Sequence, residues 1–268
     1  MGPGRGSTRC SHGQPIEPAK PQTPHDTERY AFFMTGPISQ ALAEFRANPT
    51  AGGWLQLPFF QDGSAETVAA KVDAVIASGA QVLPPPEAVF TSISLTPLDR
   101  VKVVVLGQDP YPTPGDSHGL AFSYRGSRRL PASLRTILAE MAEDLSVPMP
   151  KSGDLSKWAK QGVLLINTSL TVEAGQSGAH MKFGWSALVD QAIAAISAQQ
   201  PAVVFLLWGG PARKRAALVD RTKHLVIEAG HPSPLNRLND FRGTRPFSRA
   251  NAWLVEKGLE PVDWRLDT

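Results

Sequence analysis

The sequence has few of the residues on which many catalytic and binding sites depend. Its 268 residues include one cysteine, Cys10, which excludes an internal disulfide, a four-cysteine zinc site and a cysteine-held iron–sulfur cluster. No apolar run approaches the roughly 20 residues of a membrane helix, and the start MGPGRGSTRC lacks the apolar stretch of a secretory signal. These absences predict an intracellular protein, cytoplasmic and without a membrane partner.

Nucleotide and metal motifs are missing as well. The sequence has no Gly-x-Gly-x-x-Gly, no P-loop and no metal-ligand spacing, which argues against dinucleotide binding and phosphoryl transfer. We therefore expect no cofactor and no metal. What is present fits a globular protein, because 42% of the residues are hydrophobic and the mean hydropathy is −0.16.

The charge is mildly basic, with a net charge of +3 and a pI of about 9.1, which is compatible with a polyanionic partner. Any one group of basic residues is equally well explained as solvated surface. Three groups, however, each follow a candidate site loop: Arg125, Arg128 and Arg129; Arg213, Lys214 and Arg215; and Arg237, Arg242 and Arg245.

The chain is predicted to form one α/β domain. Residues 1–28 are rich in Gly, Pro, Ser and Gln and predict a disordered tail, followed by a single domain over residues 29–268. Continuous apolar runs alternate with amphipathic helical patterns, which predicts a four-stranded, parallel, twisted sheet flanked by helices. The predicted strands are 103–106, 163–166, 202–208 and 224–227, and the predicted helices are 38–47, 64–78, 134–145 (with Ser133 as N-cap), 155–160, 185–197, 211–219 and 247–256.

The stretch from Val101 to Tyr124, VKVVVLGQDPYPTPGDSHGLAFSY, combines a buried strand with an unusual loop. Asp109 and Pro110 would suit an ordinary turn for local reasons. The loop also carries Tyr111 and Phe122, which a turn does not need and a site for a flat ligand does. In a parallel sheet the residues after each strand converge on one edge, and here they are Gln108 to Tyr111, Asn167, Gly209 and Gly210, and His231 to Leu235.

Three of these residues are open to two interpretations from the sequence alone. Asn167 is either a backbone cap or, because its amide offers a donor and an acceptor, a reader of a base edge. His231, which precedes a proline, is either structural or part of the site. Leu235 either packs against its own loop or acts as a wedge in a base stack.

Five strings carry a specific resemblance: GQDPY, GLAFS, LLINTSLTV, FLLWG and HPSPL, in this order. Over about residues 35–265 the sequence resembles family 1 uracil-DNA glycosylase. The resemblance implies a monomeric hydrolase that flips uracil out of single- or double-stranded DNA, hydrolyses its N-glycosidic bond and so initiates base-excision repair. It also implies DNA-mimicking protein inhibitors and single-strand-binding protein as further partners.

The resemblance implies two catalytic residues. Asp109 would position or activate water and stabilise positive charge on the sugar, and His231 would donate a hydrogen bond to uracil O2. Asn167 would pair with the O4 and N3 edge of uracil, and Tyr111 would exclude the methyl group of thymine. The remaining uracil contacts would be Phe122, which stacks on the base, and the main chain of Gln108, which binds O2.

The resemblance also implies contacts to DNA. Leu235 would fill the gap left by the flipped nucleotide, while Ser133, Gly209 and Ser233 match loops that pinch the backbone in the family. We add His180 and Arg242 as predicted phosphate ligands. One departure stands out, because Pro112 occupies a position where the family commonly has His; a phosphate contact by that His would be lost or replaced.

Two other functions remain as alternatives. The first is a non-catalytic nucleic-acid-binding module of the same fold, which the presence of both Asp109 and His231 disfavours. The second is a glycosylase that acts on another lesion, which Tyr111 and Asn167 disfavour.

Overall fold

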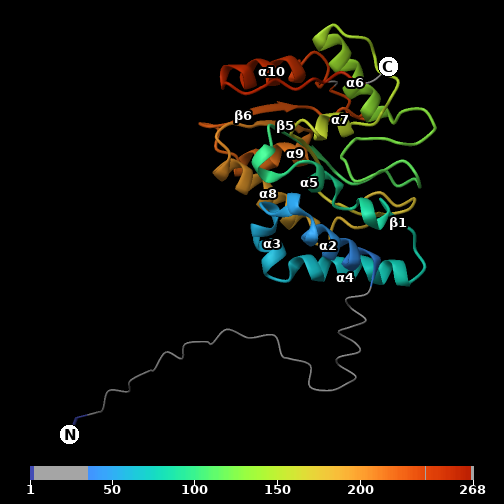
Figure 1. The fold of residues 1–268 in the computed structure, drawn as a ribbon, viewed down its shortest axis with the longest axis vertical. Helices are drawn as coiled ribbons and strands as arrows, with labels where there is room; N and C mark the ends of the chain where they lie inside the picture. The colour runs from blue at the N-terminus through green and yellow to red at the C-terminus, as the bar shows by residue number, and fades with distance from the viewer. Residues whose placement is uncertain (3–35, 239, 267–268) are drawn as a thin grey trace.

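The computed structural model describes residues 1–2, 36–238 and 240–266 and has a four-stranded sheet at its centre (Figure 1). All three strand pairs are parallel, in the order β3-β2-β5-β6, so the predicted α/β fold with a parallel sheet is confirmed. The strands are β2 (Val103–Gly107), β3 (Val163–Asn167), β5 (Val204–Trp208) and β6 (Leu225–Ala229).

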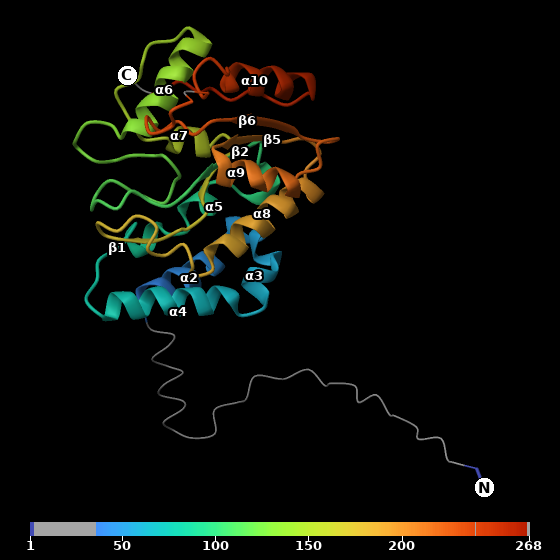
Figure 2. The same ribbon diagram turned by 180° about the vertical axis from the view of Figure 1, so that it is seen from behind.

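Helices cover both faces of the sheet because alternate residues of each strand point to opposite sides. Val104 and Leu106 of β2 pack into one apolar cluster, whereas Val103 and Val105 pack into a second. Figures 1 and 2 show the sheet between the two layers. The first layer holds α2 (Pro37–Ala47), α3 (Pro58–Gln61), α4 (Ser64–Ala77), α8 (Trp185–Gln199) and α9 (Gly210–Lys214), with α5 (Thr91–Leu95) beside it; the second holds α6 (Ala132–Leu145), α7 (Ser156–Ala159) and α10 (Pro246–Glu256).

A small antiparallel pair was not predicted. Strand β1 (Val82–Leu83) pairs with β4 (Val172–Glu173) outside the main sheet. Each strand has only two residues, too few to produce the alternation by which a strand is recognised in a sequence. The pair nevertheless matters for the site, because β4 leads directly into the segment that reaches Asp109.

Three local predictions differ from the structure. Ser133 is not the N-cap of α6; Pro131 holds that place in an extended conformation, and the helix begins at Ala132. The predicted helix 211–219 changes to a 3₁₀ helix at Arg215. Strand β6 runs from Leu225 to Ala229 and not over 224–227, and it includes the exposed Glu228.

The predicted tail, residues 1–28, lies outside the described residues apart from Met1 and Gly2, as does the boundary at residue 29. That division of the chain stays a prediction. Within the described ranges, no helix combines the length and the apolar character needed to cross a bilayer.

Candidate active site

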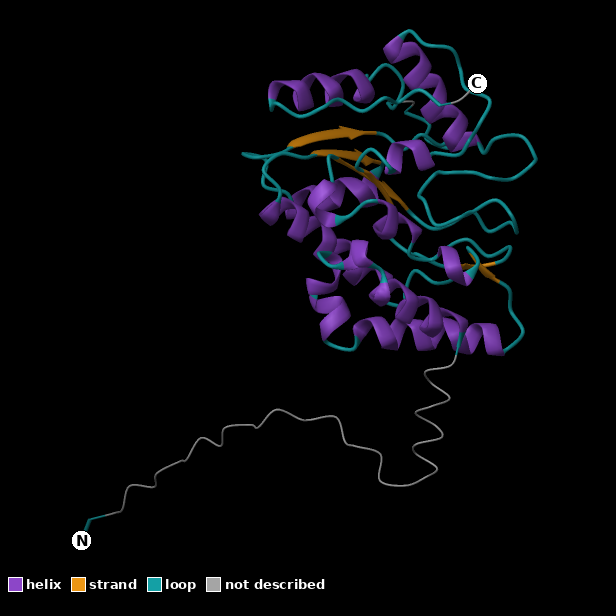
Figure 3. Ribbon diagram, in the orientation of Figure 1, coloured by secondary structure: helices purple, strands orange, loops and turns teal. Residues whose placement is uncertain are grey.

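The candidate site residues lie where the strands of the main sheet end. In Figure 3 the strand arrows point toward the side on which the longest loops extend. Parallel pairing places Gly107 beside Asn167 and Trp208 beside Ala229, so the segments that follow all four strands leave from one edge. This is the edge at which open α/β sheets bind ligands.

The carboxylate of Asp109 is held by three donors. Its Oδ2 accepts hydrogen bonds from Ser177 Oγ at 2.9 Å and from the Gly178 amide at 2.6 Å, and its Oδ1 accepts one from Gln108 Nε2 at 3.1 Å. The side chain is only half-buried. Asp109 therefore has a defined orientation while remaining accessible to a ligand.

Sequence reasoning missed Ser177 and Gly178. They lie 68 and 69 positions from Asp109, and no motif in their segment indicates a role. Tertiary structure brings them near, because the Gly175 amide donates to the Pro112 carbonyl at 2.7 Å. Pro112 has no side-chain donor, but its main chain anchors the segment that orients Asp109.

The amide of Asn167 is nearly buried and is set by the register of two strands. Gly107 lies directly opposite, and a Cβ there would collide with Asn167 Oδ1, so only glycine leaves room for this side chain. Asn167 is 6% exposed, and its amide has no hydrogen-bond partner within residues 36–238 and 240–266. A backbone cap would require such a bond, so the geometry favours an amide that reads a ligand.

Tyr111 and Phe122 form one wall of the site. The Tyr111 hydroxyl donates to the Phe122 carbonyl at 2.9 Å, and burial raises the pKa of Tyr111, which keeps the hydroxyl protonated. Phe122 has a φ of +63°, a backbone conformation that residues other than glycine rarely adopt and that tends to occur at functional sites. Its ring lies 5.9 Å from that of Trp208 and 6.3 Å from that of His231.

His231 is positioned as a neutral donor. Its Nδ1 accepts the Ser233 amide hydrogen at 3.0 Å, which places the ring hydrogen of a neutral imidazole on Nε2. Burial lowers the pKa of His231 and so disfavours the imidazolium. The ring packs on Gly209, where φ is +88° and a Cβ would lie 3.1 Å from His231 Cβ. Glycine is thus required both for that conformation and for the close packing.

The loop after β6 presents Leu235 to solvent. The Leu235 amide donates to Ser233 Oγ at 3.2 Å, and Asn236 Nδ2 braces the loop through the His231 carbonyl at 3.0 Å and Asp240 Oδ1 at 2.7 Å. The Leu235 side chain is 90% exposed. It therefore does not pack against its own loop in the free protein, which favours the wedge interpretation.

Comparisons with known proteins agree with this geometry. Residues 93–255 match the model of the uracil DNA glycosylase superfamily. Over 188 residues the chain is 51% identical to uracil-DNA glycosylase of Rhizobium meliloti (strain 1021), covering 70% of this chain and 78% of that protein. Identity is 47% over 190 residues to uracil-DNA glycosylase of Azotobacter vinelandii (strain DJ / ATCC BAA-1303), covering 71% and 82%.

The chain belongs to the uracil-DNA glycosylase superfamily. Among solved structures, a variant of mimivirus UNG in complex with UGI is similar, with a TM-score of 0.74 and 26% identity over 82% of this chain and 89% of that chain. Mimivirus uracil-DNA glycosylase itself shares the fold, with a TM-score of 0.75 at 24% identity over 89% of this chain and 92% of that chain.

The two predicted phosphate ligands, His180 and Arg242, differ in how exposed they are to a ligand. The structure does not support His180, which is 1% exposed, bonds Thr171 Oγ1 through Nδ1 at 2.9 Å and stacks on Phe183 at 4.3 Å. Arg242 is exposed, and the described residues offer it no ion-pair partner. Ser133 is half-buried in the first turn of α6, where it remains reachable.

Proposed function

We propose that this chain hydrolyses the N-glycosidic bond of uracil in DNA, releasing uracil and leaving an abasic site, and so initiates base-excision repair. The observation that carries the proposal is the unpartnered amide of Asn167, nearly buried at the same sheet edge as Asp109 and His231. A nearly buried amide without a partner is costly unless a ligand supplies its hydrogen bonds. In a member of the uracil-DNA glycosylase superfamily, the edge of a nucleobase is the ligand that would supply those hydrogen bonds.

Asp109 and His231 divide the chemistry between the two sides of the bond. As the bond between the sugar and uracil N1 breaks, its electron pair leaves with the base, and negative charge gathers on O2. A neutral His231 donates Nε2–H to that oxygen, and the Gln108 main chain adds a second dipole. Asp109, oriented by Ser177 and Gly178, stabilises the positive charge on the sugar and aligns the attacking water. The oxygen of that water bonds to C1′ while one of its O–H bonds breaks and the proton is released, and the uracil anion takes up one proton from solvent, so one water is consumed for each uracil released.

Selectivity for uracil rests on Asn167 and Tyr111. The Asn167 carbonyl accepts from uracil N3–H and its NH₂ group donates to O4, a pattern that cytosine reverses. Tyr111, fixed through its hydroxyl to the Phe122 carbonyl, occupies the space that the methyl group of thymine would need. Phe122 stacks on the base and so lowers the net cost of extruding it, a few kcal/mol.

DNA is held by groups around this centre. Leu235 enters the gap left by the flipped nucleotide, while Ser133, Gly209 and Ser233 contact the backbone and Arg242 binds a phosphate. Because mimivirus UNG was solved with UGI, we propose that a protein inhibitor that mimics DNA also binds here. We further propose that the protein acts as a monomer in the cytoplasm and that single-strand-binding protein is a partner.

The direct test is incubation of the full chain with uracil-containing DNA in EDTA, followed by alkaline cleavage at abasic sites. We expect cleavage at uracil and none in a matched strand with thymine. Two variants test the assignments within the site: Tyr111→Ala should release thymine, and Asn167→Asp should begin to release cytosine. Absence of any uracil release would overturn the function, and absence of both gains would overturn the assignments.

A further inference from the structure

The turn that orients Asp109, residues 176–181, reaches the interior of the protein at one point. Within residues 173–184, all of which the structure describes, His180 is the one buried residue and is 1% exposed. The other residues of this stretch are exposed or half-buried, so burial of apolar surface contributes little to holding them. Attachment of the turn to the core therefore depends on the His180 side chain.

The His180 ring is oriented by a chain of hydrogen bonds from buried residues. Trp185 Nε1, which can only donate, donates to Thr171 Oγ1 at 2.8 Å. The Thr171 hydroxyl can then donate its own hydrogen to His180 Nδ1, which lies at 2.9 Å. Burial lowers the pKa of His180 and so favours the neutral ring that accepts at Nδ1. The ring also stacks on Phe183 with 4.3 Å between centroids, which fixes its plane.

The same turn presents two donors to the carboxylate of Asp109. Gly178, two positions before His180, donates its amide to Asp109 Oδ2 at 2.6 Å, and Ser177 Oγ donates to the same oxygen at 2.9 Å. The Met181 amide donates to the Gly178 carbonyl at 3.1 Å, so the main chain on both sides of His180 belongs to one closed turn. A shift of the His180 ring would therefore move both donors together.

The imidazole is retained at this position although it leaves a polar atom unsatisfied. His180 Nε2 is buried and has no hydrogen-bond partner within residues 36–238 and 240–266. A phenyl ring would stack on Phe183 without burying such an atom. The gain that the imidazole offers over a phenyl ring is the bond from Thr171 to Nδ1, which sets where the ring, and with it the turn, is held.

We propose that His180 is a positioning residue for uracil hydrolysis, which acts by holding the 176–181 turn and thereby the Asp109 carboxylate. The proposal rests on the proposed function, in which Asp109 faces the sugar and the attacking water. His180 acts through Ser177 and Gly178 and not by contact with the substrate. Small displacements matter here, because a misplacement of about 1 Å at reacting groups can cost about 100-fold in rate.

Thr171→Val tests the proposal by removing the hydroxyl while leaving the imidazole in place. The single-turnover rate of the full chain on uracil-containing DNA should fall roughly 10- to 100-fold, while affinity for that DNA stays unchanged. The matched control is Thr96→Val. Thr96 is also buried, and its hydroxyl donates to the Ala159 carbonyl at 3.1 Å and lies 3.4 Å from the carbonyl of Val163, at the opposite end of β3 from the site. The control should keep the wild-type rate.

Two substitutions of His180 make the same comparison independently, because Thr171→Val also removes the acceptor of Trp185 Nε1. His180→Asn keeps an acceptor for the Thr171 hydroxyl, whereas His180→Phe keeps a ring for Phe183 and has no acceptor. Rescue of the rate by Asn but not by Phe is the expected result. A higher rate in the Phe variant than in the Asn variant would show that only filling of the core matters.

A second background separates positioning of Asp109 from a general loss of packing. In Asp109→Ala the turn has no carboxylate to orient, so adding Thr171→Val or His180→Phe should cause little further loss of rate. An equal fold-change in the wild-type and Asp109→Ala backgrounds would overturn the proposal.

The amide resonance of Gly178 in a proton–nitrogen correlation spectrum gives a readout that needs no turnover. Thr171→Val and His180→Phe should shift this resonance in the direction in which Asp109→Ala shifts it, and Thr96→Val should leave it in place. An unmoved resonance, or wild-type rates in both variants, would overturn the proposal. Failure of the wild type to release uracil would count against the proposed function, whereas the Gly178 resonance would still test whether His180 holds the turn.

Discussion

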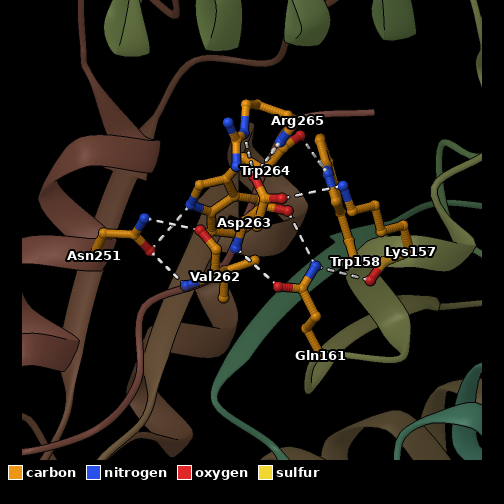
Figure 4. A network of polar contacts seen from close by, with 8 residues as sticks. All are labelled: Lys157, Trp158, Gln161, Asn251, Val262, Asp263, Trp264 and Arg265. Carbon is orange, nitrogen blue, oxygen red and sulfur yellow. Dashed lines mark hydrogen bonds and ion pairs between the residues drawn. The ribbon is translucent and has the colours of Figure 1, made fainter. Parts of the chain in front are cut away.

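Two parts of the molecule use the same kinds of side chain in opposite ways. The extended C-terminal segment, residues 259–266, is held by side-chain amides (Figure 4). Asn251 bonds both the amide and the carbonyl of Val262, each at 2.9 Å. Gln161 does the same with Asp263, at 2.8 and 3.0 Å. Each amide thus takes the place of a neighbouring strand.

Charged and aromatic groups complete that arrangement. Asp263 accepts from Arg265 Nε at 2.7 Å and from Lys157 Nζ at 3.1 Å, and these bonds hold its pKa well below the ordinary value. Trp158 Nε1 donates to the Trp264 carbonyl at 2.7 Å. In this segment the polar side chains therefore form hydrogen bonds within the protein, and these bonds hold the C-terminal chain in place.

At the candidate active site, groups of the same kind lack hydrogen-bond partners within the described residues. The Asn167 amide and His231 Nε2 have no hydrogen-bond partner in residues 36–238 and 240–266, and Leu235 is 90% exposed. A satisfied amide stabilises the fold, whereas one that is positioned but unsatisfied is available to a ligand. The comparison predicts that variants of the two regions separate stability from activity.

The largest effect is expected for Asp109→Asn. An amide in place of the carboxylate loses the negative charge that faces the sugar, which should lower kcat by about 10²–10³-fold. Single-turnover measurement on uracil-containing DNA gives the rate, and a binding assay should show that affinity for the DNA is retained. Turnover close to that of the wild type would show that Asp109 does not have the assigned role.

Asn251→Ala should lower stability and leave catalysis alone. It removes the two bonds to Val262 and a third from Trp264 Nε1 at 3.1 Å, so we expect a loss of about 1–3 kcal/mol in the free energy of unfolding. Urea unfolding gives the stability, and kcat/KM of the folded variant should match the wild type. The matched variant is Asn167→Ala, for which activity should fall while stability barely moves; the reverse outcome would reject the comparison.

Leu235→Ala should affect duplex DNA more than single strands. A single strand has less stacking to overcome, so the wedge matters less there. We expect kcat/KM on duplex to fall about tenfold, within the few kcal/mol that restacking is worth, with an unchanged melting temperature. Equal loss on both substrates together with a lower Tm would mean that the side chain packs within the protein.

The smallest expected effect concerns His118, a buried residue outside the assigned site. Burial lowers its pKa from the ordinary 6.5 to about 4, so below pH 6.5 the unfolded chain takes up a proton that the folded chain refuses. Stability should therefore fall as the pH drops from about 6.5 to about 4; His180 and His231, whose pKa values are also lowered by burial, act in the same direction. In His118→Asn the loss of folding stability over this pH range should be smaller by on the order of 1 kcal/mol after solvent screening. The check is Tm measured against pH for the variant and the wild type. An equal dependence of Tm on pH in both proteins would contradict the prediction.

The strands of the main sheet and the edge at which the site lies could be predicted from the sequence, because both follow from local residue patterns. Buried parallel strands need continuous apolar runs, and β2, β3 and β5 follow them closely. The residues after those strands had to meet at one edge once the sheet was parallel. That logic predicts that Asp109, Asn167 and His231 lie at one edge, and the motif strings indicate the family.

Tertiary structure alone decided which of those groups are free. Whether an amide or imidazole is satisfied depends on partners remote in the sequence: Ser177 reaches Asp109 across 68 positions, while nothing within the described residues reaches the Asn167 side chain. Burial, and not hydrogen-bond satisfaction, disfavours His180 as a phosphate ligand: it is 1% exposed, bonded to Thr171 and stacked on Phe183. A sequence pattern reports which residue types lie near a strand end, but hydrogen-bond satisfaction and burial are set by contacts between distant segments, and these become known only when the chain is folded.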